Sequence, residues 1–110
     1  MPITIHITYR GQSGAARLFA QEMTSAGVVS AIRAQEGCLA YAYYLPMDDD
    51  EAVLLMDSWA SQQALDRHHA SPMMAQIAAL REKYSLSMTV ERFIPDEAGI
   101  PDRDRAFIRP

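Results

Sequence analysis

Apolar and polar side chains alternate with a period of two in several short segments of this chain. In residues 3–9 (ITIHITY) every second side chain is a large apolar one or Tyr, and the others are Thr and His. This alternation, with its β-branched residues, predicts a strand. Residues 85–93 alternate in the same way, whereas 38–45 is strand-like and rich in Tyr and 52–59 is an apolar strand; the acidic turn between the last two predicts a hairpin. The pattern therefore predicts four strands.

The longest segment with helical spacing lies between the first two strands. Residues 14–35 place apolar side chains three and four positions apart, which predicts an amphipathic helix. Gly27 interrupts this spacing, so we expect a kink or a brief break there. Ser13 is a candidate cap at the start, and Gly37 suits a left-handed residue after the end.

A second helical region lies between the third and fourth strands. Ser61 is placed to cap a short helix with the sequence QQALDRHH, and a longer amphipathic helix follows to about residue 83. Ser71 and Pro72 precede this longer helix, which favours Ser71 as its cap and Pro72 as its first helical residue.

The order of these elements is strand, helix, strand, strand, helix pair, strand. This order predicts an α+β fold of the ferredoxin-like βαββαβ kind, with one antiparallel sheet and helices on one face. Residues 1–94 form the expected domain. Residues 95–110 are rich in Pro and charge, so we expect an extended, non-helical tail, with Phe107 and Ile108 anchoring its end on another surface.

The face of the sheet away from the helices also needs a cover. The strand at 38–45 carries apolar or aromatic side chains on both of its faces. A sheet with two such faces is seldom left in water. We therefore expect a homodimer in which the two sheets meet.

Composition narrows the class of protein. The chain has 110 residues, 49% of them hydrophobic, which suits a single domain with a sizeable core. The net charge is −4 and no basic cluster is present, which argues against a nucleic-acid partner. No apolar run is long enough for a membrane span, and the first residues have no signal-peptide pattern, so we expect a cytoplasmic protein with no membrane partner. The single Cys38 supports neither a disulfide framework nor a thiolate metal site.

One stretch concentrates the rare side chains. DSWASQQALDRHHASPMM (57–74) holds the only Trp and two of the three His residues. Together with EGCLAYAYYL (36–45) and the βαββαβ order, this stretch resembles the antibiotic biosynthesis monooxygenase family over about residues 3–93. The resemblance rests on the Glu-Gly-Cys turn, the acid-x-Trp of Asp57 and Trp59, and the spacing from Trp59 to His68.

The resemblance implies a dimeric α+β barrel in which two antiparallel sheets meet face to face. The family includes cofactor-free oxygenases of quinols and polyketide phenols, haem-degrading enzymes, and an isomerase of a phosphorylated autoinducer, whose end is similar to DRDRAFIRP (102–110). We expect a cofactor-free monooxygenase that uses O₂ on a quinol-like or phenolic small molecule. An isomerase of a small phosphorylated hydroxy-carbonyl compound, or a non-catalytic dimer that binds a small molecule, stays open as an alternative.

Three positions depart from patterns within the family. An amide residue precedes the Trp by four in the polyketide-phenol oxygenases, whereas this chain has Leu55. The haem-degrading group has a His on the helix after Ser-Pro, whereas AQIAAL here contains no ligand. The isomerase has Tyr where this chain has Trp59. No haem ligand, flavin motif or metal cluster is visible, so we expect neither a cofactor nor a metal.

The candidate site residues lie on the third strand and on the helix that follows it. Trp59 is expected to wall a pocket and stack a flat substrate, or else to fill the core. His68 is three positions after Leu65, so both should point inward, with His69 pointing out. His68 is the candidate base, because an imidazole titrates near neutral pH, or else a structural tie.

Four further residues complete the expected site. His6 is a candidate second acid or base, or else a satisfied polar group in an interface. Tyr41 is a candidate catalytic residue that orients a substrate oxygen, and Tyr43 and Leu55 are candidates for substrate binding. Packing alone is the alternative for the tyrosines.

Overall fold

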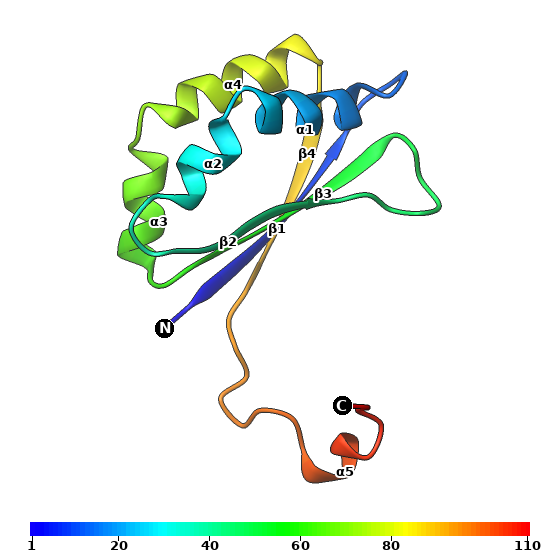
Figure 1. Ribbon diagram of the computed structural model, residues 1–110, viewed down its shortest axis with the longest axis vertical. Coiled ribbons are helices and arrows are strands. Elements are labelled where there is room, and N and C mark those ends of the chain that lie inside the picture. Colours follow the sequence, from blue (N-terminus) through cyan, green and yellow to red (C-terminus); the bar gives the residue numbers. More distant parts are fainter.

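Four strands form one antiparallel sheet in the computed structural model, which describes residues 1–110. The strands are β1 (Ile3–Arg10), β2 (Cys38–Tyr44), β3 (Ala52–Trp59) and β4 (Ser87–Phe93), in the spatial order β2-β3-β1-β4. The helices α1 (Ala15–Ser25), α2 (Val28–Arg33), α3 (Gln62–His69) and α4 (Met73–Lys83) all lie on one face of the sheet (Figure 1). The predicted α+β, ferredoxin-like βαββαβ fold is confirmed.

The strand register decides which side chains meet the helices. β1 is central, and its Ile5 pairs with Asp57 of β3 and with Arg92 of β4. Odd-numbered residues of β1 and β3 therefore face the helices, as the burial of Ile3, Ile5, Tyr9, Val53, Leu55, Asp57 and Trp59 shows. These side chains pack against the inner faces of the helices and form the core.

Two glycines end helical segments, as the sequence predicts. Gly27 has a φ of 81° and separates α1 from α2, so the expected break is confirmed. Gly37 has a φ of 82°, and a Cβ on it would lie 2.5 Å from the Cβ of Ala64. Position 37 therefore requires Gly for two reasons, the left-handed backbone and the close approach of α3.

The predicted helix caps are only partly correct. Ser61 caps α3 by accepting a hydrogen bond from the Ala64 amide. Ser71 does not cap α4, because its hydroxyl donates to the carbonyl of His68, 2.6 Å away, and Pro72 is the N-cap. Ser13 does not cap α1 either. Gly14 is the N-cap there, and its amide donates to the Glu51 carboxylate at 3.0 Å.

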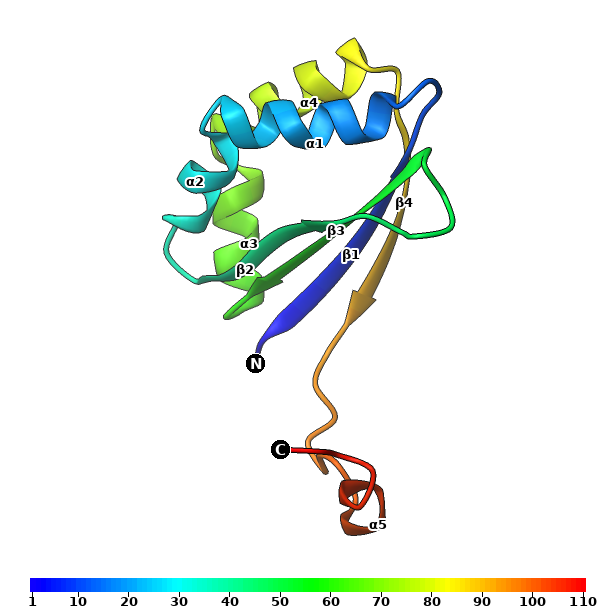
Figure 2. The ribbon, with the colours of Figure 1, turned by 45° about the vertical axis from the view of Figure 1, so that its right-hand side comes forward.

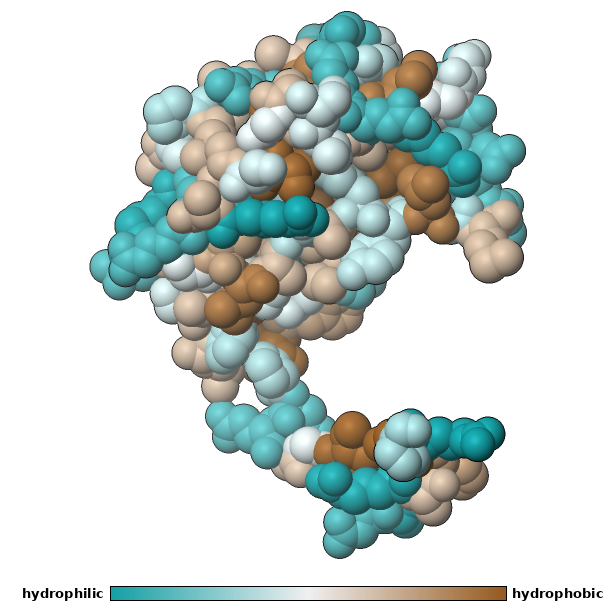
Figure 3. Space-filling model, in the orientation of Figure 1, coloured by the Kyte–Doolittle hydropathy of each residue, from teal (hydrophilic) through white to brown (hydrophobic).

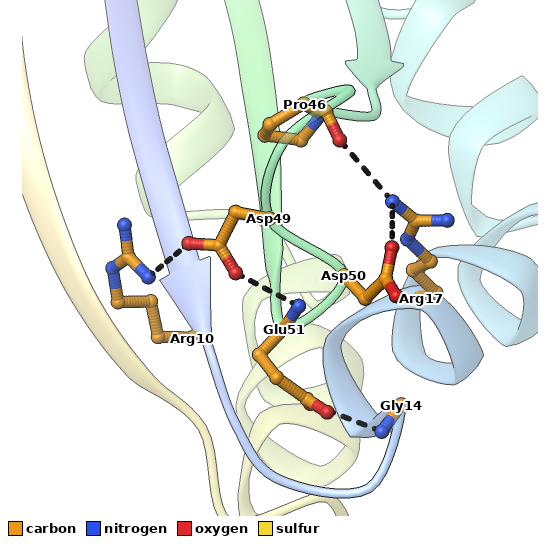
Figure 4. Close-up of polar contacts among 7 residues, drawn as sticks. All are labelled: Arg10, Gly14, Arg17, Pro46, Asp49, Asp50 and Glu51. Carbon is orange, nitrogen blue, oxygen red and sulfur yellow. Dashed lines mark hydrogen bonds and ion pairs between the residues drawn. The ribbon is translucent and has the colours of Figure 1, made fainter.

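The loop between β2 and β3 is held by polar contacts to β1 and α1 (Figure 4). Arg10 pairs with Asp49 at 2.5 Å, and Arg17 reaches the Pro46 carbonyl at 3.3 Å. Glu51 joins the same loop to the start of α1. These contacts fix the hairpin at the end of the sheet far from α3.

The helix-free face of the sheet, here called the open face, carries the even-numbered residues of β1 and β3 and is uncovered in the single chain (Figure 2). His6 lies at its centre, and its ring is 4.7 Å from that of Phe93. Tyr44 and Phe93 are 50% and 43% exposed. The sheet is open rather than closed into a barrel.

The tail runs away from the domain, and the prediction that it contains no helix is wrong. Residues Asp102–Arg105 form the single turn α5, which starts after Pro101. A fixed φ at that proline and the acidic Asp102 and Asp104 in the first turn favour this start. Phe107 is 87% exposed, and hydrophobic surface is visible on the tail (brown in Figure 3).

None of the helices is long and apolar enough to cross a membrane.

Candidate functional site

A mainly apolar cavity of about 220 Å³ lies between the sheet and helices α3 and α4. The sheet contributes Ile5, Ile7, Tyr9, Tyr41, Leu55 and Asp57 to its wall. The helices contribute His68, His69, Met74, Ile77 and Arg81, while Met88 and Val90 of β4 close the remaining side. A mainly apolar hollow with a few convergent polar groups is typical of small-molecule sites.

Asp57 is the buried acid of this cavity. It is 4% exposed, and its Oδ2 accepts a hydrogen bond from Trp59 Nε1 at 2.8 Å. No protein atom hydrogen-bonds its Oδ1, although that atom is buried. Burial raises the pKa of this carboxyl, and the hydrogen bond from Trp59 offsets only part of that effect. Asp57 therefore offers a buried oxygen that lacks a protein partner.

His68 lies on the inner face of α3 and is 4% exposed. Its ring stacks on Trp59, and its Nδ1 lies 2.7 Å from Gln35 Oε1. An amide oxygen only accepts hydrogen bonds, so Nδ1 carries the proton and Nε2 is the acceptor. Burial lowers the pKa of His68 to about 4, so the ring is neutral at pH 7.

His69 of α3 and Arg81 of α4 also line the cavity. His69 is exposed, yet it lines the cavity beside His68. Arg81 is half-buried on α4, has no carboxylate within ion-pair distance, and places Nη1 3.2 Å from Met88 Sδ. Its positively charged guanidinium is free to pair with an anion.

The phenols of the cavity are kept neutral by burial. Tyr41 is 3% exposed, and burial raises its pKa strongly. Burial raises the pKa of Tyr9 to about 12, although the charge of Arg81 lowers it in part. Both side chains therefore offer neutral hydroxyl groups at pH 7.

The structure brings together some of the sequence-predicted residues and separates others. His68, Tyr41 and Leu55 line the same cavity. Trp59 is fully buried and does not line it, because its indole lies behind the His68 ring. His68 points inward, as the spacing predicts, whereas His69, expected to point outward, is exposed but also lines the cavity.

Tyr43 and His6 lie outside this cavity. Tyr43 faces the helices, but it packs near α1 and lines a separate hollow with Arg17 and Thr24. His6 is even-numbered on β1 and lies on the open face, so the sheet stands between it and His68. Neither residue contributes to the cavity wall.

The sequence interpretation gave two lining groups no role in the site. Asp57 was recognised beside Trp59 and shares the inward parity of Leu55 and Val53, and an acid at a core position of a strand is the signal for a site role. Arg81 gives no such signal, because its helix is apolar on several sides and its position beside Met88 depends on the packing of α4 against β4.

No group of three or more His, Cys, Asp or Glu side chains in residues 1–110 is placed to hold a metal ion. The expectation that the protein needs no cofactor stays a prediction.

Comparison with known proteins agrees with the fold. The sequence model of the antibiotic biosynthesis monooxygenase family matches residues 2–80. No curated protein matches the chain. Among solved structures, a putative antibiotic biosynthesis monooxygenase from Deinococcus radiodurans is 20% identical, with a TM-score of 0.74 over 88% of this chain and 94% of that one.

Two further structures have the same architecture. A protein from Mycobacterium tuberculosis is 24% identical, with a TM-score of 0.74, and covers 90% of this chain and 100% of its own. SnoaB, a cofactor-independent oxygenase from Streptomyces nogalater, is 14% identical, with a TM-score of 0.72, and covers 87% of this chain and 94% of its own. At these identities the likeness establishes the fold alone.

Proposed function

Because the chain belongs to the antibiotic biosynthesis monooxygenase family, we propose that it is a cofactor-free monooxygenase of a small quinol-like or phenolic compound. The observation that carries the proposal is the neutral His68, whose acceptor nitrogen belongs to a ring that lines an apolar cavity. Its proton-bearing nitrogen is already engaged by Gln35. The ring is therefore held ready to accept a proton from a bound hydroxyl.

The overall reaction balances without a cofactor. A quinol and O₂ give a hydroxyquinone and water. The quinol gives up four electrons, two through its hydroxyl groups and two through the ring C–H bond that becomes C–OH. One oxygen atom enters that new C–O bond and the other leaves as water. The protein has to bind the quinol, accept a proton and exclude bulk water.

Proton transfer to His68 begins the reaction. Its Nε2 takes the hydroxyl proton, and the resulting anion reduces O₂ and forms a carbon–oxygen bond as a peroxide. The peroxide O–O bond then breaks as the oxygenated ring carbon loses its hydrogen as a proton. That proton and the one returned from His68 go to the oxygen that leaves as water. Tyr41, a neutral hydroxyl in the same wall, orients the substrate oxygen by hydrogen bonding.

The weak basicity of His68 is compatible with turnover. Transfer from a phenol with a pKa of about 10 to a ring with a pKa of about 4 costs about 8 kcal/mol. A total barrier of about 17 kcal/mol still gives a rate on the order of 1 s⁻¹. The proton transfer therefore uses about half of that barrier and leaves the remainder for the reaction with O₂.

The size of the cavity limits the substrate. Sites for drug-sized ligands occupy roughly 300–1,000 Å³, and this cavity has about 220 Å³. A compound of one or two aromatic rings suits this volume better than a tetracyclic polyketide. Leu55, where the polyketide-phenol oxygenases have an amide, gives the wall an apolar side chain at that point.

Oxygen uptake with the two-ring quinol menadiol tests the proposal. We expect uptake above the rate of spontaneous oxidation, and one atom of ¹⁸O from ¹⁸O₂ in the hydroxyquinone product. The variant His68→Ala should lose the enzymatic part, and Gln63→Ala, exposed on the same helix and outside the cavity, serves as the control. Turnover of a hydroxy-carbonyl phosphate without oxygen uptake would instead support the isomerase alternative.

A further inference from the structure

Asp57 and Arg81 are polar groups of the cavity that the proposed proton transfer does not use. Asp57 is 4% exposed, and its Oδ1 lacks a partner within the protein. A buried carboxylate oxygen without a partner has lost its hydration and gained no hydrogen bond in return. An oxygen in this position is therefore poised to bind a ligand.

Either protonation state of Asp57 favours a hydroxyl as that ligand group. Its Oδ2 accepts from Trp59 Nε1, so a proton on the carboxyl would lie on Oδ1. A charged Oδ1 accepts a hydrogen bond and a protonated one donates, and a hydroxyl matches both because it is donor and acceptor. A charged Asp57 repels an anionic ligand group, so a hydroxyl is the group that suits both protonation states.

Arg81 offers the complementary chemistry at the other end. It is half-buried, it pairs with no carboxylate, and its closest polar contact is the weakly accepting Met88 sulfur. A guanidinium in such a place binds carboxylates through two parallel hydrogen bonds. Its charge reaches the cavity wall, since it lowers the pKa of Tyr9.

The strand register sets the separation of the two groups. Asp57 pairs with Ile5 of β1, whereas Met88, which Arg81 contacts, pairs with Tyr9. Four residues along a strand correspond to about 13 Å. The two polar groups therefore lie on the order of 10 Å apart, with apolar side chains such as Ile7 and Leu55 between them.

We infer that the cavity selects a hydroxylated aryl carboxylate of one or two rings, with its hydroxyl on Asp57 Oδ1 and its carboxylate on Arg81. This inference deepens the proposed function, because it concerns the same cavity. In a quinol that carries a carboxylate, one hydroxyl meets Asp57 and the other meets His68. Both residues lie at the Trp59 end of the cavity.

Calorimetric binding of three matched probes tests this selection without any turnover. The probes are 6-hydroxy-2-naphthoate, 2-naphthol, which lacks the carboxylate, and 2-naphthoate, which lacks the hydroxyl. We expect the wild-type protein to bind the hydroxynaphthoate about 10-fold or more tightly than either single-group probe. Equal affinity for the hydroxynaphthoate and 2-naphthol would overturn the inference.

Three variants test which residue binds each end of the ligand. Arg81→Gln should abolish the advantage of the hydroxynaphthoate over 2-naphthol, and Arg67→Gln, which removes an exposed charge outside the cavity, should keep it. Asp57→Leu, which removes every hydrogen-bonding atom at this position, should abolish the advantage over 2-naphthoate. The inference is contradicted if either cavity variant still binds the hydroxynaphthoate more tightly than the probe that lacks the corresponding group. If Arg81→Gln unfolds, Arg81→Lys keeps the charge but not the paired donors and should weaken hydroxynaphthoate binding several-fold.

The outcome of the probe-binding test can be distinguished from the outcome of the oxygen-uptake test. If the protein still consumes oxygen with menadiol but shows no selectivity among the probes, the inference is wrong and the proposed function stands. If the protein selects among the probes as expected but consumes oxygen with no quinol, the proposed function is wrong and the inferred class of ligand stands.

Discussion

The Trp59 indole and the His68 imidazole are stacked, with ring centroids 4.6 Å apart and planes inclined by 22°. The same indole donates its Nε1 hydrogen to Asp57. One fully buried aromatic side chain therefore positions both the candidate base and the buried acid of the cavity. Positioning of this kind reduces the reorganisation that a reaction needs.

Replacing His68 by Ala should lower turnover by about 10²–10⁴-fold, because a positioned base contributes that much. Gln63→Ala should change turnover little, since that side chain is exposed on the same helix and lies outside the cavity. Steady-state rates per folded molecule, with any accepted substrate, make the comparison. If His68 has only a structural role, its replacement should lower the free energy of unfolding by about 1–3 kcal/mol and leave the turnover rate unchanged.

The stability of the fold should depend on pH through His68. Its pKa is about 4 in the folded protein and 6.5 in the unfolded chain, so between these values only the unfolded chain takes up the proton. The free energy of unfolding should therefore fall by up to about 3 kcal/mol as the pH drops from 6.5 to 4, and this contribution is constant above 6.5.

Denaturant titrations of the wild type and His68→Gln at several pH values isolate this effect. The raised pKa of Asp57 acts in the opposite direction, because its contribution is present below the unfolded pKa and is lost as the pH rises through the folded one. Asp57 is present in both proteins, so the difference between them reports His68. A difference that does not vary with pH would contradict the prediction.

Glu51→Ala should destabilise the protein by about 1 kcal/mol, because the Glu51 carboxylate accepts from the Gly14 amide at the start of α1. Asp50→Ala is the control from the same loop (Figure 4). Asp50 is 87% exposed and its contact with Arg17 is 3.5 Å long, so its loss should cost close to zero. Melting temperatures that fall equally for both variants would show that the loop acts as a whole.

We expect a homodimer built through the open face, with more than about 1,000 Å² buried. Met56 lies on that face opposite His6, so Met56→Arg should produce monomers in sedimentation experiments. Met47→Arg, in the exposed loop after β2, should not. A wild-type protein that is monomeric at micromolar concentration would disprove the prediction.

Deleting residues 96–110 should weaken this dimer or lower its melting temperature. The tail leaves Ile100, Phe107 and Ile108 exposed in the single chain (Figure 3), and burying such side chains contributes about 1.5–3 kcal/mol each. Dimer dissociation constants of the full and shortened chains provide the measurement. Unchanged dissociation and melting would show that the tail does not contact the partner.

Local sequence patterns predicted most of the secondary structure, because they depend on local physics. The period of two located β1, and the gap in helical spacing at Gly27 located the break between α1 and α2. Caps were harder. Ser71 is a good cap by type, but its hydroxyl is used by the His68 carbonyl, and the group that meets Gly14 comes from Glu51, 37 residues away.

The sequence alone determined the order of the elements, the inward direction of His68 and the inward parity of Asp57, since each follows from a helical or strand period. Only the tertiary structure decided which of these groups meet. Cross-strand register set Tyr41 opposite Asp57 and placed His6 on the other face. The packing of α4 against β4 brought Arg81 to the cavity, because contacts between distant segments depend on the whole fold and leave no local periodicity in the chain.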